Sequence, residues 1–357
     1  MKKYVLLCRQ VLILILFVMW LSPCSAAQTN LNCSYETGLF REQLNENSRK
    51  CYDAIECMCK KNQLAINDQN YVSVTIDRGL GEQSDYCFEM KLIECDNERT
   101  LTSNGQRAVT RELNRIFDAF VYDHPQYYWI KELYGCDDSL SMSDVKSIDG
   151  KNFGTASMNV KIKASYWDKV TPNKRVSFLK AADRYYRKCI FGKTTNYEKV
   201  KSFHDKLCKD VEYRDDYSSE YDQTAADVFL PSYDGNKNMS EGVCEAYAKA
   251  MKILCDKAKI PCIIVSGYAE NEDAVGNHAW NEVKMDDGNW YAIDLTWDDV
   301  GKNCVYDFFL SGNNTIINGS KFSESHIAGK LELIHGGFLD LDFGYPELSE
   351  SKFVLDK

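Results

Sequence analysis

Apolar and polar residues follow two periods along the N-terminal half of the chain. Residues 71–76 (YVSVTI) and 156–166 (ASMNVKIKASY) alternate between apolar and polar side chains, which predicts strands with one buried face. Residues 107–122 place apolar side chains three and four positions apart, which predicts a helix with one buried face. Two further helices are predicted over 176–189 and 197–208. This mixture predicts an α+β region.

The C-terminal half predicts a helix followed by three strands. Residues 244–258 carry an apolar stripe at helical spacing, and an apolar run over 262–268 follows Pro261. A second strand is predicted to begin at His278 (HAWNEVKM), and a third covers 290–297 (WYAIDLTW). This order favours one helix packed against an antiparallel sheet.

The loop between the last two predicted strands decides which side chains share a face. A two-residue loop at Asp287-Gly288 would place His278 and Asp294 on opposite faces, because side chains alternate along a strand. A three-residue loop, Asp286-Asp287-Gly288, places them on one face and gives Gly288 the left-handed position that closes such loops. We therefore expect His278 and Asp294 to meet only across an odd-length loop or a bulge.

The N-terminus is typical of a secretory signal peptide over residues 1–27. Two lysines precede an apolar run over 11–21, and the small residues at 25–27 offer a cleavage site. The run is short for a membrane-spanning helix, so we expect no stable membrane insertion after cleavage. These features predict a secreted, extracellular protein.

The chain of 357 residues has room for about two domains after this segment. A Gly/Thr/Asn turn at 191–196 (FGKTTN) is the predicted boundary. It separates a cysteine-rich α+β N-terminal region, 28–190, from a C-terminal domain, 191–357.

The number of cysteines indicates both disulfide bonds and at least one unpaired thiol. The chain has fifteen cysteines, and loss of Cys8 and Cys24 with the signal peptide leaves thirteen. Most thiols pair in an oxidising compartment, and an odd number leaves at least one unpaired. We interpret Cys57-Met58-Cys59 as disulfide partners, because that is the commoner use in a secreted chain.

Charge excludes one class of partner. The formal net charge is −10 and the pI is about 5.2, whereas a nucleic-acid-binding protein needs a basic face.

Cys244, His278 and Asp294 are the residues in which we expect the chemistry. Nucleophilic thiol catalysis requires a cysteine, a histidine that takes its proton, and a carboxylate that orients the histidine. Cys244 lies in the first turn of a predicted helix, with Ser240 or Asn238 as the expected cap. That position stabilises a thiolate and leaves a backbone N–H for an oxyanion. The alternatives for Cys244 are a structural disulfide or a metal site, and we interpret His124 and His326 as structural.

The motifs around these residues resemble the transglutaminase-like superfamily, most closely its secreted microbial branch. GVCEAYAKAM, NHAWNEV and YAIDLTW match the three motifs of the family triad at Cys244, His278 and Asp294, which are 34 and 16 residues apart. The resemblance extends over roughly 202–309, and a weaker one covers 117–130 (FDAFVYDHPQYYWI).

The resemblance implies a papain-like core in which the cysteine helix packs on an antiparallel sheet. It also implies an acyl-thioester mechanism on protein or peptide amides, with no cofactor or metal. Water or a lysine amine would resolve the thioester, so peptidase, amidase and cross-linking activities all stay open. Gln223 resembles a residue frequent at this place in similar proteins and is a candidate oxyanion donor.

Two features favour an alternative, a catalytically silent binding module of the same fold. Cys255, Cys262 and Cys304 lie in the core sequence, where a disulfide to Cys244 would silence it. Glycosylation at Asn238, six residues before Cys244, would crowd the site.

Overall fold

The structure is a computed structural model that describes eleven stretches of the chain. They are residues 38–61, 71–73, 75–77, 83–164, 172–213, 223–230, 240–270, 275–301, 303–332, 338–341 and 343–355. The predicted signal peptide and Asn238 lie outside these residues. Within them, no helix is both long and apolar enough to cross a membrane.

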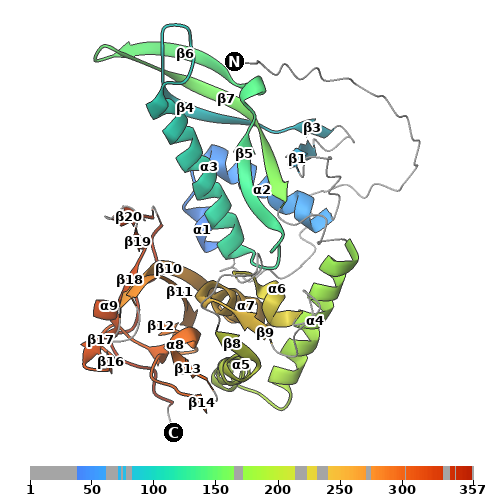
Figure 1. Cartoon of the computed structure of the whole chain (residues 1–357), viewed down its shortest axis with the longest axis vertical. Helices are drawn as coiled ribbons and strands as arrows, with labels where there is room; N and C mark the ends of the chain where they lie inside the picture. The colour runs from blue at the N-terminus through green and yellow to red at the C-terminus, as the bar shows by residue number, and fades with distance from the viewer. Residues whose placement is uncertain are drawn as a thin grey trace, which may run out of the picture.

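The N-terminal half contains a five-stranded antiparallel sheet built around one long strand, β7 (Lys151–Ala164). Helices α2 (Glu46–Lys61) and α3 (Ser103–Asp123) accompany this sheet in the upper half of Figure 1. The other elements of this half are α1 (Leu39–Glu42), β1 (Tyr71–Ser73), β2 (Thr75–Asp77), β3 (Gln83–Asp85), β4 (Cys87–Cys95), β5 (Ile130–Gly135), the 3-10 turn Asp137–Ser139 and β6 (Ser141–Ile148).

Helix α3 confirms the helix predicted over 107–122 and extends it by four residues at its start. Thr102 caps its N-terminus, where the Thr102 hydroxyl accepts a hydrogen bond from the Gly105 N–H at 3.2 Å. The apolar stripe at helical spacing is buried, with Leu113, Ile116 and Phe120 at most 5% exposed. The other face of α3 is free to carry polar residues toward the C-terminal half.

The C-terminal half contains a second five-stranded antiparallel sheet, in the order β15-β12-β11-β10-β18. Helix α7 (Cys244–Ala258) packs against its strands β10 (Cys262–Glu270) and β11 (Val275–Lys284), so the predicted α+β fold with a cysteine helix on an antiparallel sheet is confirmed. The other principal elements are α4 (Pro172–Ile190), α5 (Asn196–Asp210), α6 (Ala225–Phe229), β12 (Trp290–Ile293), α8 (Leu295–Asp298), β15 (Phe309–Ser311), α9 (Phe322–Ser325) and β18 (His326–Ala328).

Four pairs of two-residue or three-residue strands lie around this sheet in the described part of the C-terminal half. They involve β8 (Val211–Tyr213), β9 (Ser240–Gly242), β13 (Asp299–Val300), β14 (Asn303–Cys304), β16 (Ile316–Ile317), β17 (Ser320–Lys321), β19 (Lys330–Glu332) and β20 (Phe338–Asp340).

The hairpin between β11 and β12 has the three-residue loop that allows His278 and Asp294 to meet. Asn281 pairs with Ile293, and the Met285 N–H donates to the Asn289 carbonyl at 3.0 Å. Gly288 has a φ of +85°, the left-handed conformation expected at the end of such a loop. The predicted register is therefore confirmed.

The third predicted strand is wrong in its second half. It was expected to cover 290–297, but β12 ends at Ile293 and a short helix, α8, follows. The cause is Asp294, whose carboxylate accepts hydrogen bonds from the N–H groups of Thr296 (3.0 Å) and Trp297 (3.3 Å). These bonds make Asp294 a helix cap, which turns the chain out of the sheet.

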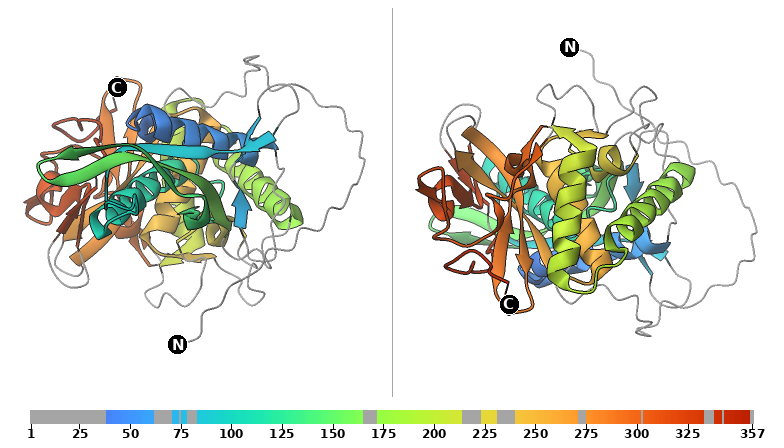
Figure 2. Two further views of the ribbon diagram at one scale, coloured as in Figure 1. Left: turned by 90° about the horizontal axis from the view of Figure 1, so that it is seen from above. Right: turned by 90° about the horizontal axis from the view of Figure 1, so that it is seen from below.

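The two halves share an apolar core. Phe40 meets Phe343 edge-on at 5.1 Å between ring centroids, and Tyr128 lies 4.7 Å from Phe178. Helix α4, which precedes the predicted domain boundary at 191–196, lies beside α5 (Figure 2, right) and also packs against α6 and α7. The boundary stays a prediction from sequence, and the packing places α4 with the C-terminal sheet.

Candidate active site

Cys244 is the first residue of α7, as expected, but its helix lacks the predicted cap. The N-cap residue is Val243, which has no side chain that can accept a hydrogen bond. The Ser240 hydroxyl instead donates to the Val228 carbonyl at 2.8 Å, and so fixes β9 rather than α7. No side chain caps the first turn, so the N–H groups of Cys244 and Glu245 stay available to an anion in front of Cys244, while the Ala246 N–H donates to the Val243 carbonyl at 3.0 Å.

The Cys244 side chain is half-buried beside a small apolar cluster. The cluster consists of Ala248 from the same helix, Ile264 of β10 and Ala279 of β11, and Tyr122 of α3 packs against it as well. The N-terminal half thus contributes directly to the surroundings of the thiol. Figure 1 shows the lower end of α3 reaching the C-terminal sheet at this point.

The other core cysteines have neighbours of their own. Cys262 is close enough to Cys255 to raise its pKa, and Cys304 is close enough to Cys208 to raise its pKa. The sequence left open a disulfide from Cys255, Cys262 or Cys304 to Cys244. Each of these cysteines has another cysteine as a neighbour, and pairing with that neighbour would compete with a disulfide to Cys244.

His278 connects Cys244 to Asp294. Its Nε2 lies 2.7 Å from Asp294 Oδ2, and its ring is also within hydrogen-bonding reach of the Cys244 thiol. Burial by itself would lower the pKa of His278. The charge and hydrogen bond of Asp294, with a smaller effect from Cys244, outweigh burial and raise the pKa to about 10. The imidazole is therefore positively charged at neutral pH and can stabilise a thiolate.

Asp294 is fully buried and accepts four hydrogen bonds. Its Oδ1 accepts the two N–H groups of α8, and its Oδ2 faces His278 and the Nε2 of His326 at 3.2 Å. Burial would raise the pKa of this carboxyl, but the two histidines hold it below its usual range. Asp294 is consequently a charged and immobile partner for His278.

His326 is the residue that sequence reasoning missed. It was interpreted as structural, but the structure places it in β18 with its ring against Asp294. Burial lowers the pKa of His326, so it is neutral. Because the Asp294 carboxylate can only accept a hydrogen bond, the neutral His326 ring carries its proton on Nε2, which binds Asp294. No local sequence signal points to this contact, since β18 reaches the site only by pairing with β10.

Aromatic side chains shield these groups from water. Trp297 lies parallel to the His278 ring at 5.1 Å and 22°, while Trp280 meets His326 edge-on at 5.0 Å. A shielded histidine–carboxylate pair has a stronger interaction than one in water.

Replacement of His326 tests its positioning role. We expect His326→Phe to lower kcat about tenfold to a hundredfold with little change in KM, because a buried hydrogen bond to a carboxylate is lost. The phenyl ring preserves the stacking on Phe322, whose ring lies 4.1 Å away. His326→Gln, which retains an N–H donor, should recover part of the loss in steady-state kinetics. Full kcat in the phenylalanine variant would contradict the role.

A cavity of about 280 Å³ lies beside the first turn of α7, between α3 and α6. Glu245, next to the nucleophile in sequence, lines it together with Asp118 and Tyr122 of α3. Burial and the neighbouring Glu245 raise the pKa of Asp118 to about 7. The segment 117–130, which weakly resembles a segment of similar proteins, forms most of the opposite wall.

Gln223 lines the same cavity, at the start of α6. Its backbone carbonyl accepts a hydrogen bond from Lys249 Nζ at 3.0 Å, and its side chain is exposed. Its role as an oxyanion donor stays a prediction.

His278, Asp294 and His326 also have ligand atoms close enough for a metal ion. Both imidazoles, however, contact the same carboxylate oxygen directly, at hydrogen-bond distances of 2.7 and 3.2 Å. One proton on each Nε2 satisfies these contacts, so the arrangement needs no ion.

Comparison with known proteins agrees with the family resemblance. A family model described as the transglutaminase-like superfamily matches residues 183–295, a range that includes Cys244, His278 and Asp294. Kyphoscoliosis peptidase of Mus musculus is 27% identical over 108 residues, which cover 28% of this chain and 15% of that protein. The match therefore spans only a small part of this relative.

Solved structures with similar arrangements include a TGase, with 14% identity and a TM-score of 0.30 over 68% of this chain and 57% of that chain. A putative cysteine protease from Cytophaga hutchinsonii has 19% identity and a TM-score of 0.27, over 47% and 65% of the two chains. The periplasmic domain of TgpA from Pseudomonas aeruginosa has 17% identity and a TM-score of 0.26, over 45% and 66%. The family match identifies residues 183–295 as a domain of the transglutaminase-like superfamily.

Proposed function

We propose that this protein catalyses thiol-dependent acyl transfer or hydrolysis at protein or peptide amides. Cys244 is the nucleophile, His278 the base and Asp294 the residue that orients the base. One observation carries the proposal: a charged His278 is held at 2.7 Å by Asp294 and reaches a cysteine at the N-terminus of a helix. Nucleophile, base and orienting carboxylate are the three parts that thiol catalysis requires.

The first half of the reaction forms an acyl-thioester. The Cys244 thiolate attacks the carbonyl carbon of a carboxamide or peptide bond, and the resulting oxyanion accepts a hydrogen bond from the Cys244 N–H. His278 then gives its proton to the departing nitrogen, so ammonia or an amine leaves and the acyl group stays on Cys244. Asp294 keeps the imidazolium in place throughout.

The second half depends on which acceptor reaches the thioester. His278, now neutral, takes a proton from water or from an amine as this acceptor attacks the thioester carbon, and the Cys244 thiolate leaves. Water gives hydrolysis, and a lysine amine gives a cross-link between proteins. The predicted signal peptide supports a reaction outside the cell.

Alkylation of the native protein by iodoacetamide tests the proposal before any substrate is known. Peptide mapping should show Cys244 modified at pH 6 much faster in the native than in the unfolded protein, because His278 stabilises its thiolate. His278→Ala should remove this advantage at Cys244 without changing the rates at the other cysteines. A Cys244 that is recovered in a disulfide, or that reacts no faster than in the unfolded chain, would favour the silent binding module instead.

A further inference from the structure

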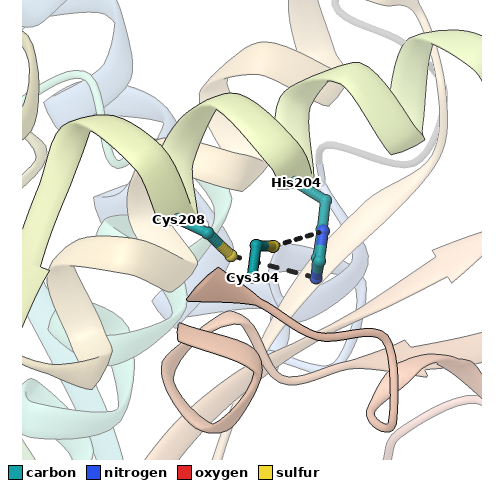
Figure 3. A group of neighbouring side chains, drawn as sticks. All are labelled: His204, Cys208 and Cys304. Atoms are coloured by element: carbon teal, nitrogen blue, oxygen red, sulfur yellow. Dashed lines mark hydrogen bonds between the residues drawn. The ribbon is translucent and has the colours of Figure 1, made fainter. Parts of the chain in front are cut away.

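A second group of thiols lies away from the proposed nucleophile. Figure 3 shows Cys208 and His204 of α5 pointing toward Cys304 of β14. His204 and Cys208 are four residues apart, so both project from one face of the helix. The two sulfur atoms lie within 4.8 Å of each other. Cys304 Sγ is also 3.5 Å from His204 Nδ1.

His204 is held as a charged group beside these thiols. Its Nε2 lies 3.0 Å from Asp298 Oδ2, both side chains are fully buried, and Asp205 Oδ1 lies 3.3 Å from Nδ1. Burial would lower the pKa of His204, but its hydrogen bonds to Asp205 and Asp298 raise it to about 10. The imidazolium is therefore present at neutral pH and faces the Cys304 sulfur.

The two thiols differ in both acidity and access. The hydrogen bond from Cys208 is the main cause that lowers the pKa of Cys304 to about 5, and His204 adds to it against the effect of burial. The same hydrogen bond, together with burial, raises the pKa of Cys208. Cys304 is half-buried, whereas Cys208 is only 3% exposed. One accessible thiolate next to one protected thiol is the arrangement that thiol–disulfide exchange uses.

We propose that Cys208 and Cys304 form a dithiol site that reacts with external disulfides of the glutathione type and closes to an intramolecular disulfide. Cys304 attacks one sulfur of the external disulfide, forms a mixed disulfide and releases the first thiolate. Cys208 then loses its proton and attacks the Cys304 sulfur, which releases the second thiolate. The two protein sulfurs are oxidised to one disulfide, and the external disulfide is reduced to two thiols, which take up the Cys208 proton and one proton from the solvent.

The closed disulfide would tie α5 to the segment that supports Asp294. Asp298 ends α8, its carboxylate accepts the Phe308 N–H at 2.9 Å, and its carbonyl accepts the Val305 N–H at 2.9 Å. The Asp298 N–H in turn donates to the Asp294 carbonyl at 3.2 Å. Cys304 directly precedes Val305, whose N–H binds Asp298. The disulfide would therefore restrict the motion of the segment that positions Asp298 and, through it, Asp294.

The pair formed by Cys255 and Cys262 provides a matched control. These thiols are also neighbours, but both are fully buried and burial raises the pKa of Cys255. No accessible thiolate is present there, so this pair should not react with glutathione in the native protein.

Glutathione titration of the full chain tests the proposal. The protein is first reduced with dithiothreitol, transferred to buffers of increasing oxidised-to-reduced glutathione ratio, blocked with iodoacetamide and mapped by mass spectrometry. Wild type and Cys244→Ala should both convert to the Cys208–Cys304 disulfide. Cys208→Ser should trap one glutathione on Cys304, and Cys304→Ser should slow the reaction at Cys208 by at least about tenfold. Cys262→Ser should behave as wild type.

Three results would overturn the proposal, and each of them can be measured on the wild-type protein if a variant fails to fold. Cys304 could remain a thiol at every ratio, or it could pair with a cysteine other than Cys208. The third result is one zinc ion bound per chain, measured by elemental analysis, that protects both cysteines from alkylation. His204, Cys208 and Cys304 would then be ligands of a metal site instead.

Discussion

Replacement of Cys244 with alanine should abolish turnover of an amide substrate while the protein stays folded. Loss of the nucleophile in a triad lowers kcat on the order of 10⁶-fold, because the acyl-enzyme can no longer form. The melting temperature should change by only about 2 °C, since the side chain is half-buried and its removal leaves the apolar cluster of Ala248, Ile264 and Ala279 in place. Steady-state kinetics and thermal unfolding measure the two effects.

Cys255→Ala is the matched control for this variant. Cys255 belongs to the same helix and is fully buried beside Cys262, so its loss should lower the melting temperature but not the rate. If Cys244→Ala unfolds the protein and Cys255→Ala inactivates it, then the assignment of the nucleophile is wrong and Cys244 has a structural role.

Asp294→Asn should lower kcat by about 10⁴-fold, because it reverses a hydrogen bond to the base. The N–H groups of Thr296 and Trp297 require an acceptor at the Oδ1 position, so the asparagine carbonyl must point there. Its NH₂ group then faces Nε2 of His278, which can accept that bond only in a neutral form protonated on Nδ1. In this tautomer His278 cannot take a proton from the thiol.

The same variant should change how stability depends on pH. The raised pKa of His278 means that the folded state binds its proton more tightly than the unfolded state, whose histidine titrates near 6.5. The stabilisation is therefore fully present below about pH 6.5. It is lost as the pH rises toward about 10.

Melting temperatures between pH 6 and pH 10 test this coupling. Wild type should lose stability over this range, and Asp294→Asn should show a shallower slope with most of its deficit at the acidic end. Asp286→Asn, in the hairpin loop, should retain the wild-type slope. Near-normal turnover in Asp294→Asn, or an unchanged slope, would remove Asp294 from the mechanism.

Much of the scaffold could be predicted from local patterns. The apolar stripe predicted over 244–258 lies on helix α7, and the apolar stripe of α3 is buried as expected. The sequence left a two-residue and a three-residue loop open, and the structure has the three-residue loop, with Gly288 in the left-handed conformation and His278 on the same face as Asp294. These features depend on residues close together in the chain, and such interactions leave a periodic signal.

Two sequence predictions are wrong, the cap of α7 and the end of the third strand, because one polar side chain has more than one possible hydrogen-bond partner. Ser240 has the side chain of a helix cap, but its hydroxyl is used by the Val228 carbonyl. Asp294 continues a strand-like pattern, yet its carboxylate captures two backbone N–H groups and begins a helix. Propensity alone does not decide between these uses, because the position of the partner depends on the fold.

Sequence by itself determined that the chain carries a cysteine helix, a hairpin whose loop allows His278 and Asp294 to share a face, and motifs that resemble those of one superfamily. Only the tertiary structure added His326 to Asp294, placed Tyr122 of α3 beside the cluster around Cys244, and brought Cys304 to Cys208 and His204. These contacts join residues from 32 to more than 100 positions apart. They form when buried faces of distant elements pack together. Contacts between residues so far apart in the chain leave no repeating pattern of apolar positions in a single sequence.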